Sequence, residues 1–314
     1  MPTPSILVAT WSNGLFNVAG SKVQQDLADQ SVRSLVSDGH GGVFAIVGQH
    51  SLCRRSAEGE WAEVIKSEFA LSCCVPIGDA VFVGTDDARV LRIGPDGKQT
   101  CLMDFEDIEG RDTWYAGAAI VDGKLLGPPL GVRSMTATCD GAALLVNIHV
   151  GGIPRSTDAG LSWRPTIDVE SDVHQVCTHA TRPDIAIAAA AVGLCISRDA
   201  GATWTLEQRG LHALHCSGVA LGRNAIFISA SIDPFAAQGA VYRRALDGDA
   251  PLQLVGGGLP EWTDGIVDTD CIATRDAMVA TIDRSGHLYL SQNDGVSWSC
   301  VAERLVDPSG LHIG

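Results

Sequence analysis

The sequence predicts an all-β fold, a seven-bladed β-propeller whose blades are four-stranded antiparallel sheets. The pattern Ser-x-Asp-x-Gly-x-x-Trp occurs at 156–163 and returns at 197–204, after about 40 residues, the length of one propeller blade. It occurs again at 291–298, with Asn293 in the acidic position, and in a shortened form at 56–61. Glycine is abundant, with 35 residues, and no useful stretch shows the 3.6-residue period of a helix. These features are typical of short strands joined by tight turns.

The repeated pattern has the chemistry of a hairpin turn. Asp side chains bond the backbone of a turn, and glycine accepts the positive φ that such turns need. The tryptophan then starts the next strand and can pack inward. We therefore expect structural roles for the Asp and Trp residues of the pattern.

The blade length divides the chain into seven units, within a single domain over residues 1–314. The first has only three strands, near 6–10, 15–18 and 22–27, and the later units cover 32–65, 71–105, 132–167, 173–207, 214–255 and 269–302. Because the first unit lacks an innermost strand, we expect the C-terminal segment 309–314 to supply it and to close the ring. Closure removes exposed sheet edges, which favour aggregation.

Composition narrows the classes of function. The net charge is −15, and Lys and Arg do not cluster, so a nucleic-acid partner is not expected. No export signal or membrane-length apolar run is visible, so we expect a cytoplasmic protein without a membrane partner. The ten cysteines are scattered, with no Cys-x-x-Cys pair, and are expected to be reduced. No nucleotide cofactor is expected.

The repeated pattern and the blade spacing resemble those of the BNR/Asp-box repeat propellers, a superfamily that includes the sialidases. The resemblance implies a propeller whose Asp-boxes lie on the face opposite the active site. It does not extend to sialidase catalysis, because the sequence has no Arg-Ile-Pro segment.

The face opposite the Asp-boxes is expected to carry the function. The longest connections, 106–131, 231–239 and 256–268, belong to this loop face, and 106–131 has the length of an insert. Trp11, Trp114 and Trp262 also fall there, and we predict that they bind substrate. The same loops could bind a protein partner.

The innermost strands begin with comparable triplets, such as Val32-Arg33-Ser34 and Val173-His174-Gln175. The middle residues should project into the mouth of the central channel, and in ring order they are His312, Arg33, Ser72, Arg133, His174, His215 and Asp270. Four of them, His174, His215, Asp270 and His312, come from adjacent blades. Three imidazoles and a carboxylate suit Zn²⁺, Fe²⁺ or Mn²⁺, so we predict a divalent metal site.

The remaining polar residues complete a hypothetical active site. Arg33 and Arg133 could grip a carboxylate or phosphate, His149 could serve as a ligand or general base, and Asp268 could orient a ligand imidazole. The sequence therefore favours a metal-assisted hydrolase or lyase acting on a small anionic molecule. Three alternatives remain open: a polar, hydrated channel without a metal, a protein-binding or assembly propeller, and a glycoside-binding or glycosidase-like protein.

Overall fold

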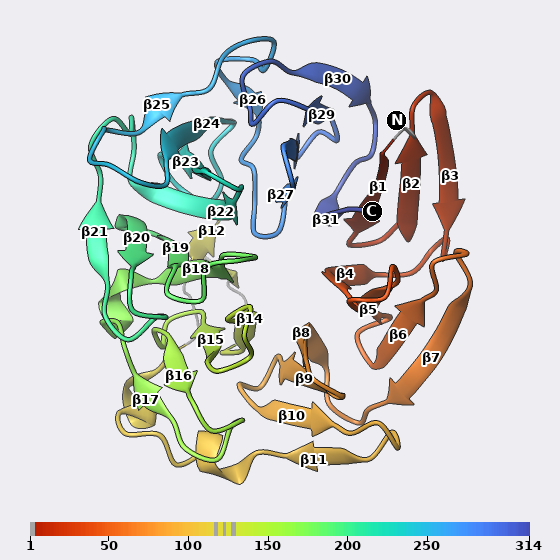
Figure 1. The fold of residues 1–314 in the computed structure, drawn as a ribbon, viewed down its shortest axis with the longest axis vertical. Helices are drawn as coiled ribbons and strands as arrows, with labels where there is room; N and C mark the ends of the chain where they lie inside the picture. The colour runs from red at the N-terminus through yellow and green to blue at the C-terminus, as the bar shows by residue number, and fades with distance from the viewer. Residues whose placement is uncertain (1–3, 116–118, 122–123, 127–129) are drawn as a thin grey trace.

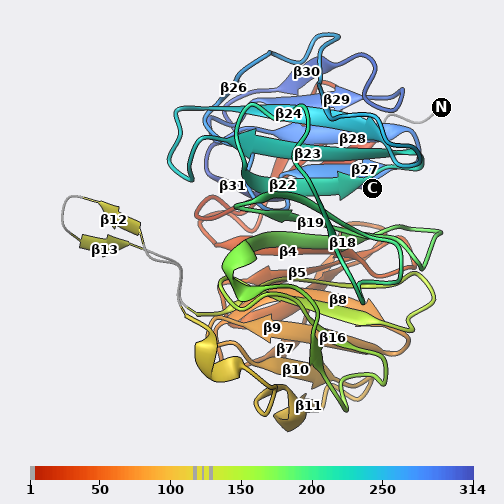
Figure 2. The same ribbon diagram turned by 90° about the vertical axis from the view of Figure 1, so that its left-hand side faces the viewer.

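The computed structural model describes residues 4–115, 119–121, 124–126 and 130–314, and its sheets surround a central axis (Figure 1). The predicted all-β, seven-bladed propeller is confirmed. Each blade is an antiparallel sheet of four main strands, and the sixth blade carries one short additional strand. Seen edge-on, the connections between strands gather at the two faces of the ring (Figure 2).

The blades follow one another in chain order, and the strands of each run from the innermost outward. The first three are β31 (Pro308–Ile313), β1 (Ser5–Thr10), β2 (Leu15–Ala19) and β3 (Lys22–Asp26); β4 (Val32–Ser37), β5 (Val43–Val47), β6 (Ser51–Arg55) and β7 (Trp61–Lys66); and β8 (Leu71–Ile77), β9 (Ala80–Thr85), β10 (Val90–Ile93) and β11 (Gln99–Cys101). The fourth and fifth are β14 (Val132–Ala137), β15 (Leu144–Ile148), β16 (Pro154–Ser156) and β17 (Arg164–Pro165); and β18 (Val173–Thr178), β19 (Ala186–Ala190), β20 (Gly193–Ser197) and β21 (Thr205–Glu207). The last two are β22 (His215–Leu221), β23 (Ala225–Ser231), β24 (Gln238–Ala245) and β25 (Gln253–Leu254), with β26 (Thr263–Asp264) on β24; and β27 (Ile272–Arg275), β28 (Met278–Ile282), β29 (Leu288–Ser291) and β30 (Ser299–Ala302).

The C-terminal strand closes the ring, as predicted. β31 pairs antiparallel with β1, placing Ile313 opposite Ile6 and His312 opposite Leu7. The amide of Gly314 also donates to the carbonyl of Ser5 at 2.8 Å. The first blade is therefore built from both ends of the chain.

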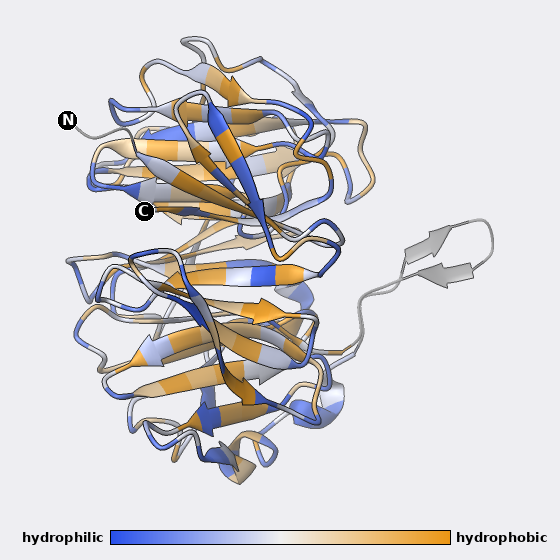
Figure 3. Ribbon diagram, turned by 90° about the vertical axis from the view of Figure 1, so that its right-hand side faces the viewer, coloured by the Kyte–Doolittle hydropathy of each residue, from blue (hydrophilic) through white to orange (hydrophobic). Residues whose placement is uncertain are grey.

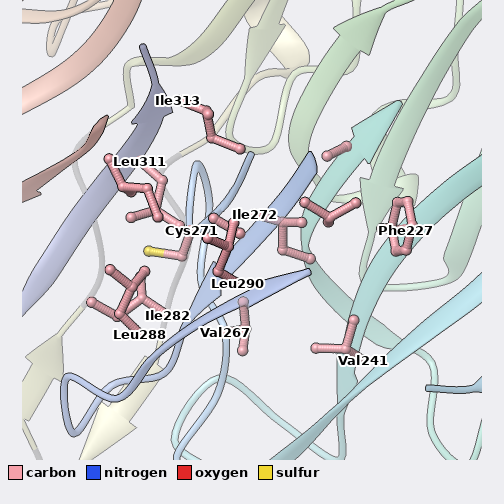
Figure 4. Close-up of a cluster of buried hydrophobic side chains, with 14 of the residues drawn as sticks. Phe227, Val241, Val267, Cys271, Ile272, Ile282, Leu288, Leu290, Leu311 and Ile313 are labelled. Carbon is pink, nitrogen blue, oxygen red and sulfur yellow. The ribbon is translucent and has the colours of Figure 1, made fainter. Parts of the chain in front are cut away.

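The core lies between neighbouring blades. The second strands of four blades are buried on both faces, because every residue of β9, β15, β19 and β23 is buried. One cluster joins Phe227 of the sixth blade, Ile272 and Leu288 of the seventh, and Leu311 and Ile313 of the first (Figure 4). Apolar residues therefore dominate the strands, whereas polar residues are frequent in the connections (Figure 3). Burial between blades is what holds the ring together.

The repeated turns share one hydrogen-bond pattern. At the first, Asp158 Oδ1 accepts from Ser156 Oγ at 2.8 Å and from the Ser162 amide at 2.8 Å, and the Trp163 indole donates to the Gly160 carbonyl at 3.1 Å. The turns at 197–204 and 291–298 repeat the two contacts to the Asp or Asn side chain. They connect the third and fourth strands of their blades.

The segment predicted as an insert, 106–131, follows the short helix η1 (Met103–Phe105) and contains a second one, η2 (Arg111–Thr113). β12 (Ala119–Val121) and β13 (Lys124–Leu126) form a two-stranded sheet apart from the blades. Within the segment 106–131, residues 116–118, 122–123 and 127–129 lie outside the described residues. A third short helix, η3 (Val169–Ser171), precedes β18. Across the described part of the chain, no helix has the length and apolar character required to cross a membrane.

Candidate functional site

A β-bulge recurs near the start of the innermost strands. In β8, β14 and β18 the pairing with the next strand skips Ser72, Arg133 and His174, respectively. A bulged residue is left out of the ladder, and its side chain is re-aimed. All three side chains line one cavity at the mouth of the channel. The triplet position singled out in the sequence is thus a bulge position in these three blades.

This cavity, with a volume of about 610 Å³, is the candidate site. The structure brings six of the seven predicted ring residues to it, namely Arg33, Ser72, Arg133, His174, His215 and Asp270. His149, Asp268 and Trp11 line it as well. The volume falls in the range typical of small-molecule sites.

His312 does not belong to this group, which corrects the prediction. β31 begins at Pro308, and Ser309 occupies the mouth, where its hydroxyl donates to the carbonyl of Val32. His312 lies farther along the strand, and the charges that act on it belong to Arg275 and Asp38. The triplet at 311–313 resembles the others in sequence, but pairing with β1 sets a different register.

We expect His312 to make the protein sensitive to acid. Burial is the main cause that lowers its pKa to about 4, below the usual value of 6.5. The unfolded chain therefore takes up the proton first, so stability is retained above pH 6.5 and is lost as the pH falls toward 4. We expect His312→Gln to reduce the loss of unfolding free energy between pH 7 and pH 4.5 by on the order of 2 kcal/mol.

Urea unfolding at the two pH values measures this loss. His40→Gln, at an exposed turn position, is the matched control and should leave the loss unchanged. An equal loss in His312→Gln and the parent would contradict the assignment.

Three donor atoms at one side of the cavity have the spacing of metal ligands. His149 follows β15, Asp172 ends η3, and His174 is the bulged residue of β18. The Nε2 atoms of His149 and His174 each lie 3.6 Å from Asp172 Oδ1, and the three donors lie within 4.8 Å of one another. Ligands about 2.1 Å from a tetrahedral ion stand about 3.5 Å apart, so these residues fit a divalent ion.

The protonation of the two imidazoles also suits a metal. His174 Nδ1 donates to the carbonyl of Cys216 at 2.6 Å, so in the neutral ring the lone pair lies on Nε2, toward Asp172. Burial, followed by the charge of Arg133, lowers the pKa of His149 to about 4 and keeps the ring neutral at pH 7. Within the described part of the chain, His149 Nδ1 and Asp172 Oδ1 are buried without a hydrogen-bond partner.

Asp172 was not predicted from the sequence. Burial, the largest single cause, opposes its ionisation, but the neighbouring imidazoles of His174 and His149 and the guanidinium of Arg133 outweigh this effect and lower its pKa. The residue has a left-handed φ of 47°, which Asp tolerates better than most residues. The sequence could have indicated Asp172 by its position, because it is an acidic residue two positions before the ring residue His174 and just outside the predicted strand.

The other predicted ligands do not join these three donors. The His215 ring packs 4.6 Å from the His174 ring between centroids, and burial is the largest cause that lowers its pKa to about 4. Asp270, whose pKa burial raises to about 6, accepts from the Gln175 amide at 2.8 Å. Of the described residues, the group whose spacing could hold a metal ion is therefore His149, Asp172 and His174, and not the predicted His174, His215, Asp270 and His312.

Gln175 connects three blades beside the cavity. Its side-chain oxygen accepts from the amides of Val219 in the sixth blade and Asp270 beside the seventh, at 2.9 and 3.1 Å. With its donation to the Asp270 carboxylate, this side chain fixes the innermost strands of three neighbouring blades relative to one another.

The two predicted arginines lie in the cavity with different partners. Arg33 donates to the carbonyl of Leu71 and to Asp86 at 2.9 Å. Arg133 crosses the mouth from the fourth blade, and its contacts are Thr269 Oγ1 at 3.2 Å and Asp268 Oδ1 at 3.4 Å. Asp268 therefore pairs with an arginine and does not take the predicted role of orienting a ligand imidazole.

The three tryptophans are in three different environments. Trp11 is exposed, lines the cavity and lies 5.6 Å from the Arg33 guanidinium. Trp114 is buried in the core against Phe105, so the predicted contact with substrate is corrected to a packing role. Trp262 is exposed and packs on His212, and it is not among the described residues that line the cavity.

No protein-family model and no curated protein matches the sequence. The fold is similar to a putative 6-phosphogluconolactonase from Bacteroides uniformis, with 12% identity, a TM-score of 0.65 and coverage of 100% of both chains. It is also similar to virginiamycin B lyase from Staphylococcus aureus, with 12% identity, a TM-score of 0.62 and coverage of 89% of this chain and 87% of the lyase. The chain is a β-propeller similar to lactonase and lyase propellers.

A third similar structure is larger. An ancestral GH74 enzyme matches 95% of this chain, with 13% identity and a TM-score of 0.62. The chain spans 40% of that enzyme's length. At these identities the likenesses establish the fold alone.

Proposed function

We propose that the protein is a metal-dependent hydrolase or lyase that acts on a small anionic substrate at the channel mouth. The observation that carries this proposal is the spacing of the donor atoms of His149, Asp172 and His174, with Asp172 Oδ1 3.6 Å from each imidazole. The names of proteins with similar folds, which include lactonases and a lyase, agree with this reaction class.

The residues of the cavity have different proposed roles. His149, Asp172 and His174 would hold a Zn²⁺, Fe²⁺ or Mn²⁺ ion. Such an ion supplies Lewis acidity toward a substrate oxygen or acidifies a bound water. His215, neutral at pH 7, can accept a proton at its imidazole, and Arg133 can orient an anionic group.

Metal titration tests the proposal directly. We expect EDTA-treated protein without a histidine tag to bind one equivalent of Zn²⁺ or Mn²⁺ in isothermal titration calorimetry. His174→Ala removes a ligand and should weaken binding at least about 100-fold. His40→Ala, which removes an exposed imidazole, should leave the affinity unchanged. A parent protein that binds no metal, or a His174→Ala variant that binds as tightly, would refute the proposal.

We further infer that the chain is a divergent member of the BNR/Asp-box propellers. The support is the shared bonding of three turns, in which Asp158, Asp199 and Asn293 accept from the same two positions. The residues of these turns do not contribute to the cavity, as far as the chain is described.

Protein binding through the loop face is the second candidate function. It is favoured by two large apolar side chains on the connection from β23 to β24, Ile232 and Phe235, which are 74% and 55% exposed. If this surface binds a protein, Phe235→Ser should release a co-purified partner without lowering the melting temperature. Retention of the partner would count against this function.

A further inference from the structure

Arg33 and Arg133 hold comparable positions at the starts of β4 and β14, and each makes two hydrogen bonds, but their side chains differ in exposure and in how closely their partners hold them. Arg33 is 12% exposed, donates to a carbonyl and to Asp86, and lies against the Trp11 ring. These three contacts tie it to its own side of the cavity. Arg33 therefore acts as part of the wall.

Arg133 is held more loosely. Its side chain is 24% exposed, and its two hydrogen bonds, 3.2 and 3.4 Å, are longer than most N–H···O bonds. Asp268 Oδ1 accepts the Thr269 amide at 2.7 Å, so its closest contact is with the backbone and the guanidinium stands farther away. Because a guanidinium has five N–H donors, most of the hydrogen-bonding capacity of Arg133 is available to a ligand.

Arg133 also lies on the side of the metal-ligand group. Val132, the residue before Arg133, pairs with Ile148, the residue before His149. Thr269 Oγ1, which accepts from Arg133, donates to the carbonyl of His174 at 3.3 Å. An anion paired with Arg133 would therefore lie beside the ion held by these residues.

The charges around the cavity limit the charge of the ligand. The described lining contains three guanidinium groups and four carboxylates: Arg33, Arg133, Arg284, Asp86, Asp172, Asp268 and Asp270. A divalent ion would change the balance from one net negative to one net positive charge. One monoanion neutralises that charge, whereas a phosphate monoester, a dianion above about pH 6, would leave a negative excess.

We propose that Arg133 is the specificity-determining residue and that the substrate is a monocarboxylate. The carboxylate pairs with Arg133, and a neighbouring oxygen of the same molecule faces the metal-ligand group. This inference rests on the proposed function. The cavity, at about 610 Å³, leaves room for the remainder of the molecule.

Calorimetry of Mn²⁺-loaded protein tests the inference, with D-gluconate, a hydroxy-monocarboxylate, and inorganic phosphate as probes. We expect gluconate to bind more tightly than phosphate. Arg133→Gln should raise the gluconate Kd at least about 10-fold, and Arg133→Lys, which keeps the charge but loses the bidentate fork, at least about 3-fold. Arg33→Gln should change the Kd less than about 3-fold, and circular dichroism verifies that each variant is folded.

Three results would overturn the inference: equal effects of Arg33→Gln and Arg133→Gln, tighter binding of phosphate than of gluconate, or no binding of gluconate to the metal-loaded protein. Failure of the proposed function gives a different result, because it appears as absent Mn²⁺ binding before any probe is added. In that case, gluconate is titrated into the EDTA-treated protein. A loss of binding on Arg133→Gln would still support Arg133 as the carboxylate-binding residue, and an unchanged affinity would reject it.

Discussion

Deletion of residues 308–314 is expected to abolish cooperative folding. This segment contains β31, which pairs with β1 and buries Leu311 and Ile313 in the cluster shared by three blades. Loss of each large apolar side chain costs about 2–5 kcal/mol, and the lost strand pairing adds to this cost. The total approaches the stability of a typical domain, about 5–15 kcal/mol, and the deletion also exposes the edge of β1.

Urea unfolding followed by circular dichroism and by tryptophan fluorescence measures this effect. The parent should unfold in one transition, and the deleted protein should show no cooperative transition or should aggregate. Leu311→Ala should cost about 2–5 kcal/mol, and Val306→Ala, at an exposed position, less than about 0.5 kcal/mol. An unchanged midpoint and slope in the deleted protein would show that β31 does not stabilise the ring.

Glu207→Ala is expected to destabilise the protein by about 3–5 kcal/mol, because it leaves a buried charge without its partner. Glu207 ends β21 and accepts from Arg244 Nη1 of the next blade at 2.9 Å. The Arg244 side chain is only 4% exposed. Arg209 also donates to Glu207, from Nε at 2.9 Å, so the substitution removes the centre of an interblade network.

The same network provides its own control. Asp249 contacts Arg209 at 2.6 Å but is exposed, so Asp249→Ala should have a much smaller effect than Glu207→Ala. The hydrogen bond from Arg209 is the largest cause that lowers the pKa of Glu207 to about 2, against a usual value of 4.5. Its stabilising effect is therefore present above pH 4.5 and is lost as the pH falls toward 2. If the two substitutions lowered the free energy of unfolding equally at pH 7, the expected dependence of the cost on burial would be wrong.

The fold could be predicted because its determinants are local and repeated. The turns at 156–163 and 197–204 carry their own hydrogen bonds, and their spacing locates the strands of each blade. Bulge positions such as Arg133 and His174 could be found by aligning the blades, because each bulge stands at the same place in its strand.

The site was predicted only in part because its remaining features depend on nonlocal contacts. The register of β31 is decided by pairing with β1, near the other end of the chain, which moved His312 out of the mouth. Asp172 lies beside the two histidines because it caps the short helix η3, and no periodic pattern in the sequence predicts this helix. Trp114 became part of the core because Phe105 and neighbouring apolar residues cover it.

The Gln175 side chain has a consequence for the kind of recognition that the mouth allows. Because it joins the fifth blade to Val219 and Asp270, the strands β18 and β22, which carry His174 and His215, cannot shift independently of each other or of Asp270. The site is therefore preorganised, and little binding energy is spent on rearranging these strands. Rigid ligands of the correct shape should therefore bind most tightly at this mouth. Flexible analogues should bind more weakly, mainly because they lose conformational entropy when they bind.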